Sequence, residues 1–175
     1  DYEASLSKAY WQSTGYGGGA RVKNFLAMCR VVELRGEDPQ VIFTAIRDQL
    51  IDQRPDEVLG YVAAGGLAYR KWDYATAAKY YLQGLAMEAE NQDLLAGLSE
   101  CFWKSNDPRL DDTLAELLKL NPNHPRAKAI EVEVLLEAGK TEEALEIIDA
   151  VLSINPNRLH FLALKAAAFF LNDEI

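Results

Sequence analysis

The sequence has little of what most catalytic and metal sites are built from. Its 175 residues include only two histidines, His124 and His160, and two cysteines, Cys29 and Cys101. Neither an HExxH motif nor a CxxC pair is present, so the ligand spacing typical of zinc sites and the framework of a disulfide-rich domain are both missing. We predict that both cysteines are buried on apolar helix faces and that His124, in a Pro-Asn-His-Pro turn, is exposed.

Basic stripes and long apolar runs are also missing. Lys and Arg number 18 against 27 Asp and Glu, which gives a net charge of -9, and the acidic excess is spread along the chain. Nucleic acid is therefore not an expected partner, because phosphates require a basic surface. No uninterrupted apolar run reaches the roughly 18 residues of a membrane-spanning helix, so no membrane association is expected. No signal peptide is visible, and the chain opens at Asp1 without Met, which leaves its compartment open.

The sequence does contain regularly spaced residues that typically end or begin helices. Prolines end three helical stretches, at Pro55, Pro122 and Pro156, and the intervals between them are 67 and 34 residues. The longer interval is two units of 34 and 33, with Ala89 where the missing proline would fall. Residues that favour helix N-caps keep nearly the same period. They are Asp38, Asp73, Asp107 and Thr141, at intervals of 35, 34 and 34.

Between these marks apolar residues recur three and four positions apart, which is the pattern of an amphipathic helix. Each unit therefore reads as two helices joined by a short turn. We expect helices at 22–35, 39–53, 58–71, 74–87, 92–104, 108–120, 125–138, 141–153 and from 159 onward. No segment shows the sustained alternation of a strand. The expected fold class is all-α.

The unit that begins at Val58 resembles the tetratricopeptide repeat, a family in which small residues let paired helices approach and larger ones fill the neighbouring groove. The matching residues are Tyr61, Ala64, Gly65, Ala68, Tyr74, Ala77, Tyr81 and Gly84. Trp72 departs from the pattern, since the family has a glycine at that turn. The resemblance implies a right-handed α–α superhelix, or solenoid, because one helix pair can bury its apolar face only against the next pair.

The resemblance also implies a division of the chain. Residues 1–23 are expected to form an N-terminal helix, at about 2–12, and a Gly-rich hinge at Gly15–Gly19. The remaining segments are a degenerate repeat at 24–57, repeats at 58–91, 92–124 and 125–158, and the first helix of a further repeat at 159–175. The hinge can also be written G-x-G-x-x-A, but no apolar strand precedes it, so a dinucleotide site is a weak alternative.

The last predicted helix, 159–171, is apolar nearly all the way round. Such a helix must be covered on more than one side. We expect the cover to come from further polypeptide, the chain being part of a longer protein, or from a second copy in a homodimer.

In the tetratricopeptide repeat family the first helices of the repeats line a concave groove that holds a peptide or a partner helix. The family's groove positions imply a partner-binding set in this chain. The set is Tyr69, Arg70, Glu100, Trp103, Lys104, Arg126, Glu133 and His160, with Arg35 extending its rim. The Lys and Asn clamp with which some members grip chaperone tails is absent, so such tails are not expected ligands.

We therefore expect a scaffold that binds a protein or peptide segment and has no catalytic site, cofactor or metal. The acidic residues between Glu131 and Asp149 are interpreted as a solvated helix face rather than as a cation site. Two alternatives stay open. The repeats could support an enzyme whose catalytic domain lies outside this segment, or the Gly-rich hinge could sense a nucleotide.

Overall fold

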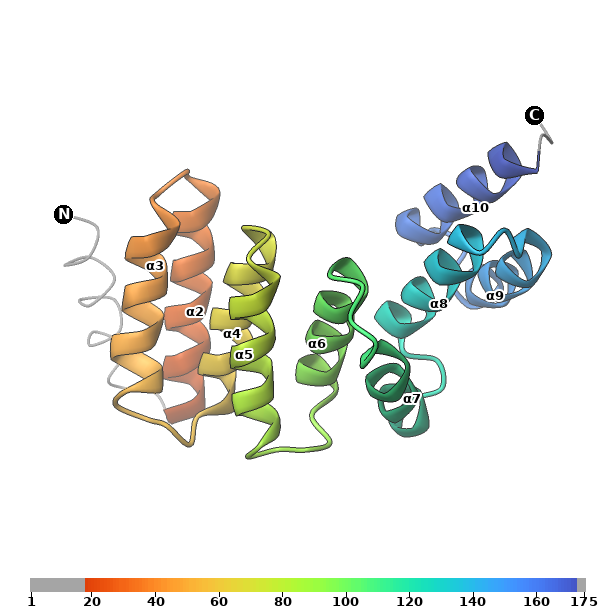
Figure 1. Cartoon of the computed structure of the whole chain (residues 1–175). Helices are drawn as coiled ribbons and strands as arrows, with labels where there is room; N and C mark the ends of the chain where they lie inside the picture. Colours follow the sequence, from red (N-terminus) through yellow and green to blue (C-terminus); the bar gives the residue numbers. More distant parts are fainter. Residues whose placement is uncertain (1–17, 173–175) are drawn as a thin grey trace. The chain divides into compact units, whose positions relative to one another are not determined.

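The computed structural model describes residues 18–172, and these residues form helices joined by short turns, with no strand among them (Figure 1). The all-α class expected from the sequence is confirmed for this part of the chain. The chain divides into two compact units, Asp1–Ser105 and Asn106–Ile175. The predicted helix at 2–12 and residues 15–17 of the predicted hinge lie outside the described residues.

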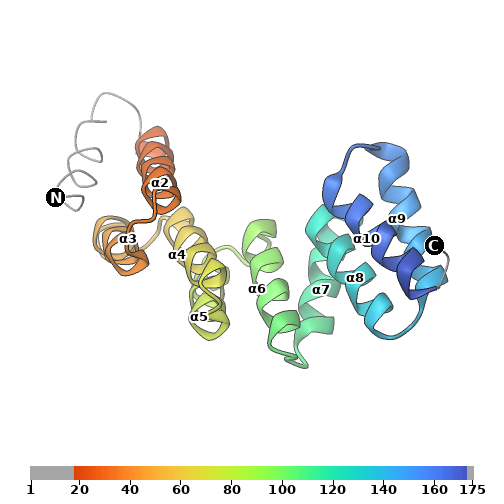
Figure 2. The ribbon, with the colours of Figure 1, turned by 90° about the horizontal axis from the view of Figure 1, so that it is seen from above.

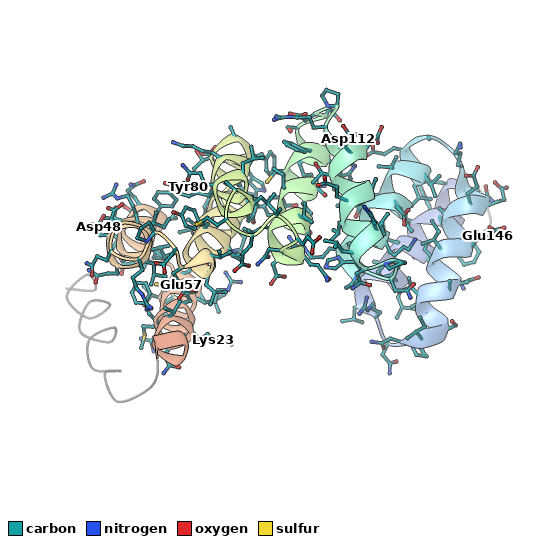
Figure 3. All side chains as sticks on the ribbon, turned by 90° about the horizontal axis from the view of Figure 1, so that it is seen from below. Lys23, Asp48, Glu57, Tyr80, Asp112 and Glu146 are labelled. Carbon is teal, nitrogen blue, oxygen red and sulfur yellow. The ribbon has the colours of Figure 1, made fainter. Side chains whose placement is uncertain are left out.

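The first unit stacks helices that run alternately up and down. Its elements are α2 (Gly18–Leu34), α3 (Pro39–Ile46), the π-helix η1 (Arg47–Ile51), α4 (Val58–Arg70), α5 (Tyr74–Leu85) and α6 (Gln92–Lys104). Helix α3 packs on α2 and α4, α5 packs on α4 and α6, and α4 also touches α6. Tyr80, labelled in Figure 3, makes an edge-to-face ring contact with Phe43 of α3 at 5.4 Å between centroids.

The second unit contains α7 (Leu110–Leu120), α8 (Pro125–Glu137), α9 (Thr141–Ile154) and α10 (Leu159–Leu171). Helices α8, α9 and α10 all contact one another and lie together in Figure 2. Their shared core is built around Val132, Ile148 and Phe161, one from each helix, and none of these side chains is more than 1% exposed. Each helix therefore buries one apolar stripe against the other two, as the spacing of the apolar residues predicts.

The observed helices begin and end close to the predicted positions, with three informative differences. Helix α2 starts at Gly18, so Gly18 and Gly19 belong to a helix and not to the predicted hinge. The single helix predicted at 39–53 is an α-helix only as far as Ile46 and continues as a π-helix. A π-helix inserts one extra residue into a turn, which a hydrophobic period of 3.6 does not reveal.

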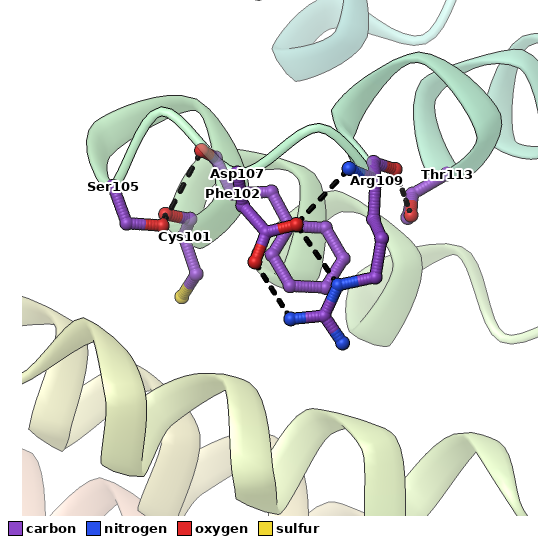
Figure 4. A network of polar contacts seen from close by, with 6 residues as sticks. All are labelled: Cys101, Phe102, Ser105, Asp107, Arg109 and Thr113. Atoms are coloured by element: carbon purple, nitrogen blue, oxygen red, sulfur yellow. Dashed lines mark hydrogen bonds and ion pairs between the residues drawn. The ribbon is translucent and has the colours of Figure 1, made fainter.

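The start of α7 was also predicted too early, at residue 108 instead of Leu110. Asp107 accepts hydrogen bonds from the Arg109 backbone N–H at 3.0 Å and from the Arg109 guanidinium Nη2 at 2.6 Å (Figure 4). These side-chain and backbone hydrogen bonds hold the pKa of Asp107 at about 2. Asp107 thus closes a short turn before the helix, and Arg109 takes the N-cap position.

Two further predictions are wrong, the N-cap role of Thr141 and the exposure of His124. Thr141 is the first residue of α9, with Lys140 as its N-cap, and the Thr141 side chain is buried. His124 is not exposed but 8% accessible, and it is the N-cap of α8. Its Nδ1 accepts a hydrogen bond from the Ala127 backbone N–H at 3.4 Å. Capping removes an unsatisfied helix donor, which gives this imidazole a structural role. Asp38 and Asp73 do cap α3 and α5, as predicted.

Four turns each contain a residue in the left-handed backbone conformation. Positive φ values occur at Gly36 (85°), Trp72 (61°), Asn106 (51°) and Gly139 (73°), each shortly after the end of a helix. In the turn at Trp72, its N–H donates to the Tyr69 carbonyl at 2.9 Å and the Asp73 N–H donates to the Ala68 carbonyl at 3.0 Å. This is the Schellman arrangement. Trp72 therefore occupies the turn position at which the family has glycine, and it adopts a backbone conformation that is rare for bulky residues.

We expect Trp72→Gly to stabilise the first unit. The left-handed backbone conformation costs residues other than glycine about 1 kcal/mol, and glycine removes this cost. Little buried surface is lost, because Trp72 is 80% exposed. Denaturant unfolding followed by circular dichroism measures the change. Trp72→Ala is the control, because alanine removes the indole and keeps the backbone strain. Equal stability of the two variants would contradict the strain argument.

Close helix approach in the first unit is centred on the ring of Tyr81. A Cβ atom added at Gly65 of α4 would lie 2.5 Å from Cε1 of this ring, and one added at Gly97 of α6 would overlap the same ring. Gly84 of α5 meets α6 in the same way, since a Cβ there would lie 2.7 Å from Cδ1 of Leu94. Large side chains thus fill spaces that only glycine backbones leave open, as the resemblance implied for Gly65 and Tyr81.

Gly65→Ala should destabilise the first unit by about 1 to 3 kcal/mol, because the new methyl overpacks a buried ring that cannot move aside. Gly66→Ala is the matched control on the next residue of α4. There the nearest atom is the flexible Nη1 of Arg70, at 3.2 Å, and alanine favours helix over glycine by about 1 kcal/mol. Urea midpoints should fall for the first variant and hold or rise for the second. The opposite order would exclude tight packing at Gly65.

Candidate functional site

The predicted partner-binding residues fall into two sets, one in each unit. Those on α4 and α6 are Tyr69, Arg70, Glu100, Trp103 and Lys104, and those on α8 and α10 are Arg126, Glu133 and His160. None of them belongs to the buried core. Side chains at these positions are half-buried or exposed, as a binding surface requires.

Arg70 is anchored by a residue that the sequence did not single out. Its Nε and Nη2 donate to the two carboxylate oxygens of Glu33 on α2, at 2.9 and 2.8 Å, and Arg30 Nη1 donates to the same carboxylate at 2.7 Å. Burial of Glu33 opposes its charge, but the hydrogen bonds from Arg70 and Arg30 outweigh it and lower the pKa of Glu33. Since 37 positions separate Glu33 from Arg70, only the packing of α2 beside α4 brings them together.

Glu33→Gln should lower the stability of the first unit by about 1 to 2 kcal/mol at pH 7, because a 7%-exposed carboxylate with two guanidinium partners is lost. The depressed pKa means that Glu33 stabilises the fold above the ordinary carboxyl pKa of about 4.3. That contribution is lost as the pH falls through the lower pKa of the folded state.

The stability difference between the wild type and Glu33→Gln should therefore be constant near neutrality and shrink below the ordinary carboxyl pKa. Unfolding curves at a series of pH values measure it. Glu90→Gln removes an equal charge from an exposed position and should change stability little at any pH. A difference for Glu33→Gln that persists in acid would show that charge is not its cause.

The two aromatic residues of the first set are half-buried on neighbouring helices. The Tyr69 ring leans on Tyr74 at the start of α5, with 5.5 Å between ring centroids. Lys104 Nζ lies 3.3 Å from the centroid of Trp103, a cation–π contact that covers one face of the indole. Both rings are thus held in place by neighbours while part of their surface stays open.

In the second unit the structure brings two predicted residues together. His160 Nε2 at the start of α10 lies 3.5 Å from Glu133 Oε1 on α8, and this contact is an ion pair when the imidazole is protonated. Arg126 is half-buried near the start of α8. Lys165 on α10 pairs with Asp149 on α9 at 2.7 Å. The two sequence-distant helices α8 and α10 therefore present their predicted positions side by side.

The described residues offer no metal site and no reactive thiol. No group of three or more His, Cys, Asp or Glu within residues 18–172 could hold a metal ion. Cys29 and Cys101 are 3% and 1% exposed, which confirms that both are packing residues, and burial raises the pKa of Cys29 to about 12. A thiol with so high a pKa is a poor nucleophile. Of the helices in this part of the chain, none has the length and apolar character to span a bilayer.

A family model described as tetratricopeptide repeat matches residues 112–168, which span α7 to α10. The period, the small-residue contacts and the helix pairs agree with it. Residues 112–168 therefore carry tetratricopeptide repeats. No curated protein matches the chain in sequence.

Solved structures of other tetratricopeptide repeat proteins share the fold. One from Parabacteroides merdae has a TM-score of 0.74 at 14% identity, covering 98% of this chain and 66% of its own. YrrB, described as having an unusual peptide-binding site, has a TM-score of 0.61 at 18% identity, with 97% and 84% covered. MamA has a TM-score of 0.64 at 14% identity, with 87% and 83% covered. At these identities the likeness is one of fold alone.

Proposed function

We propose that this tetratricopeptide repeat protein binds a peptide segment of a partner protein through Tyr69, Trp103 and their neighbours on α4 and α6 of the first unit, a surface that we call the inner face, and that this segment of polypeptide catalyses no reaction. The observation that carries the proposal is the partial exposure and fixed position of the Tyr69 and Trp103 rings. Both rings are half-buried and held by neighbours, while the same helices bury their opposite stripes in the core. Preorganised aromatic residues of this kind contribute strongly to interface energies.

The charged residues of this surface are largely matched before any partner arrives. Arg70 is engaged by Glu33, and Lys104 lies over Trp103. A partner therefore gains mainly from contact with the rings and from hydrogen bonds, and less from new ion pairs. Binding should accordingly depend weakly on salt, since screening acts on unmatched exposed charges.

The double substitution Tyr69→Ala with Trp103→Ala should weaken partner capture at least about tenfold. Affinity capture from the native source, compared between wild type and variant, measures the loss. Circular dichroism should show nearly unchanged helicity, because neither ring belongs to the core. Unfolding of the double variant would instead make the rings structural, and unchanged capture would contradict the proposed surface.

The matched control is Trp72→Ala, which removes the exposed indole of the α4–α5 turn and leaves the inner face intact. It should capture the partner as the wild type does. Capture at high and low salt then tests whether ring contacts or charges dominate.

The exposed apolar face of α10 supports a second binding partner, which is another copy of this chain. Leu159 is 80% exposed, Phe170 66% and Leu171 56%, while Phe161, Leu164 and Ala168 face the core. Sedimentation of the purified chain, run beside the capture experiment, separates a second copy from a different partner. A longer protein that covers this face, or that carries a catalytic domain supported by these repeats, would be recognised from the full-length sequence.

A further inference from the structure

The second unit contains a pocket that no predicted inner-face residue lines. It has a volume of about 520 Å³ and lies where the α7–α8 and α9–α10 turns meet the end of α9. Its residues are Pro122, Asn123, Lys128, Glu146, Ile147, Ala150, Val151, Ile154, Asn155 and Arg158. A pocket of this size accommodates a side chain or a small ligand.

The floor of the pocket is an apolar stripe of α9. Ile147, Ala150, Val151 and Ile154 recur three and four positions apart and so share one helix face. Ile154 is 76% exposed, which leaves the pocket open to solvent at its end. From Ile147 to Ile154 the stripe runs for about 10 Å, and three extended peptide residues span about the same length.

The two basic side chains around this floor differ in whether they have an acidic partner. Lys128 is matched by Glu131, with 2.7 Å between Nζ and Oε2. Arg158 is half-buried, and among the described residues no carboxylate lies within ion-pair distance of its guanidinium. Glu146, labelled on α9 in Figure 3, lies at the other end of the stripe, eight residues before Ile154. The Arg158 end of the pocket is therefore electropositive in a chain whose net charge is -9.

We propose that this pocket binds an acidic peptide of a partner protein, with a large apolar side chain on the α9 stripe and a carboxylate, two or three residues along, on Arg158. Arg recognises carboxylates through paired N–H donors. The apolar side chain supplies most of the binding free energy and the carboxylate sets the direction and selectivity. This site is separate from the inner face and does not depend on the function proposed for it.

The test uses the whole chain and two probe peptides, acetyl-Ala-Leu-Ala-Asp-amide and its Asn analogue. Titration at millimolar peptide, followed by amide chemical shifts, should perturb residues around 122–128 and 146–158. The Asp peptide should bind about three- to fivefold more tightly than the Asn peptide, the range of a partly exposed ion pair.

Arg158→Gln should abolish this preference without changing the thermal unfolding midpoint. Glu146→Gln, at the other end of the same pocket, should keep the preference. Ile154→Asp should weaken both peptides, and the exposed position of Ile154 keeps the fold intact. If Ile154→Asp unfolds the unit, Ile154→Gln replaces it.

The proposal is overturned if neither peptide binds, if the preference survives in Arg158→Gln, or if the shifts appear around Tyr69 and Trp103 instead. The Tyr69→Ala with Trp103→Ala variant should bind both peptides as the wild type does. Failure of the inner-face proposal is thus distinguishable from failure of this one.

Discussion

The approach of two helices, α4 and α6, to one aromatic ring of α5 determines how these three helices of the first unit pack. Tyr81 on α5 meets Gly65 on α4 and Gly97 on α6, at distances that leave no room for even a methyl group. Since the ring is 4% exposed, it cannot turn out to solvent to relieve a clash. The two glycines therefore let α4 and α6 lie on the same ring from different sides, and these are the helices that carry Tyr69 and Trp103.

The turns show how packing selects a backbone conformation over local preference. Gly36 and Gly139 adopt positive φ without strain, but Trp72 and Asn106 adopt it too. In the turns at Gly36, Trp72 and Gly139 the chain reverses within a few residues so that the next helix packs on the one before it, and the Schellman hydrogen bonds satisfy the last carbonyls. The burial gained along a whole helix exceeds the roughly 1 kcal/mol that an unfavourable residue costs in the turn. A glycine is thus helpful at this position but not required.

The two proposed surfaces differ in whether their positively charged side chains already have partners. At the inner face the cations have neighbours, since Arg70 binds Glu33 and Lys104 covers Trp103, so the rings provide the contact. At the pocket on α9 the floor is aliphatic and the Arg158 guanidinium is unmatched within the described residues. A fold made of repeated helix pairs can therefore present chemically different surfaces, because the residues outside the packed stripes are not fixed by the repeat.

The sequence alone predicted the helices, because their apolar period and their stop and start residues are local properties. It placed α6 at 92–104 as observed, and through the family pattern it identified Gly65 as a residue of close helix approach and Tyr81 as a residue that fills a groove. It missed the π-helix after Ile46, which the 3.6-residue period does not reveal, and the capping role of His124, because histidine is not among the residues that usually cap helices. It could not find Glu33 as the partner of Arg70 or the pocket around Arg158, because these are made by residues from separate helices and turns. The hydrophobic periodicity of a helix can be recognised from residues close together in the sequence, whereas ion pairs and pockets between helices form only when the helices pack against one another.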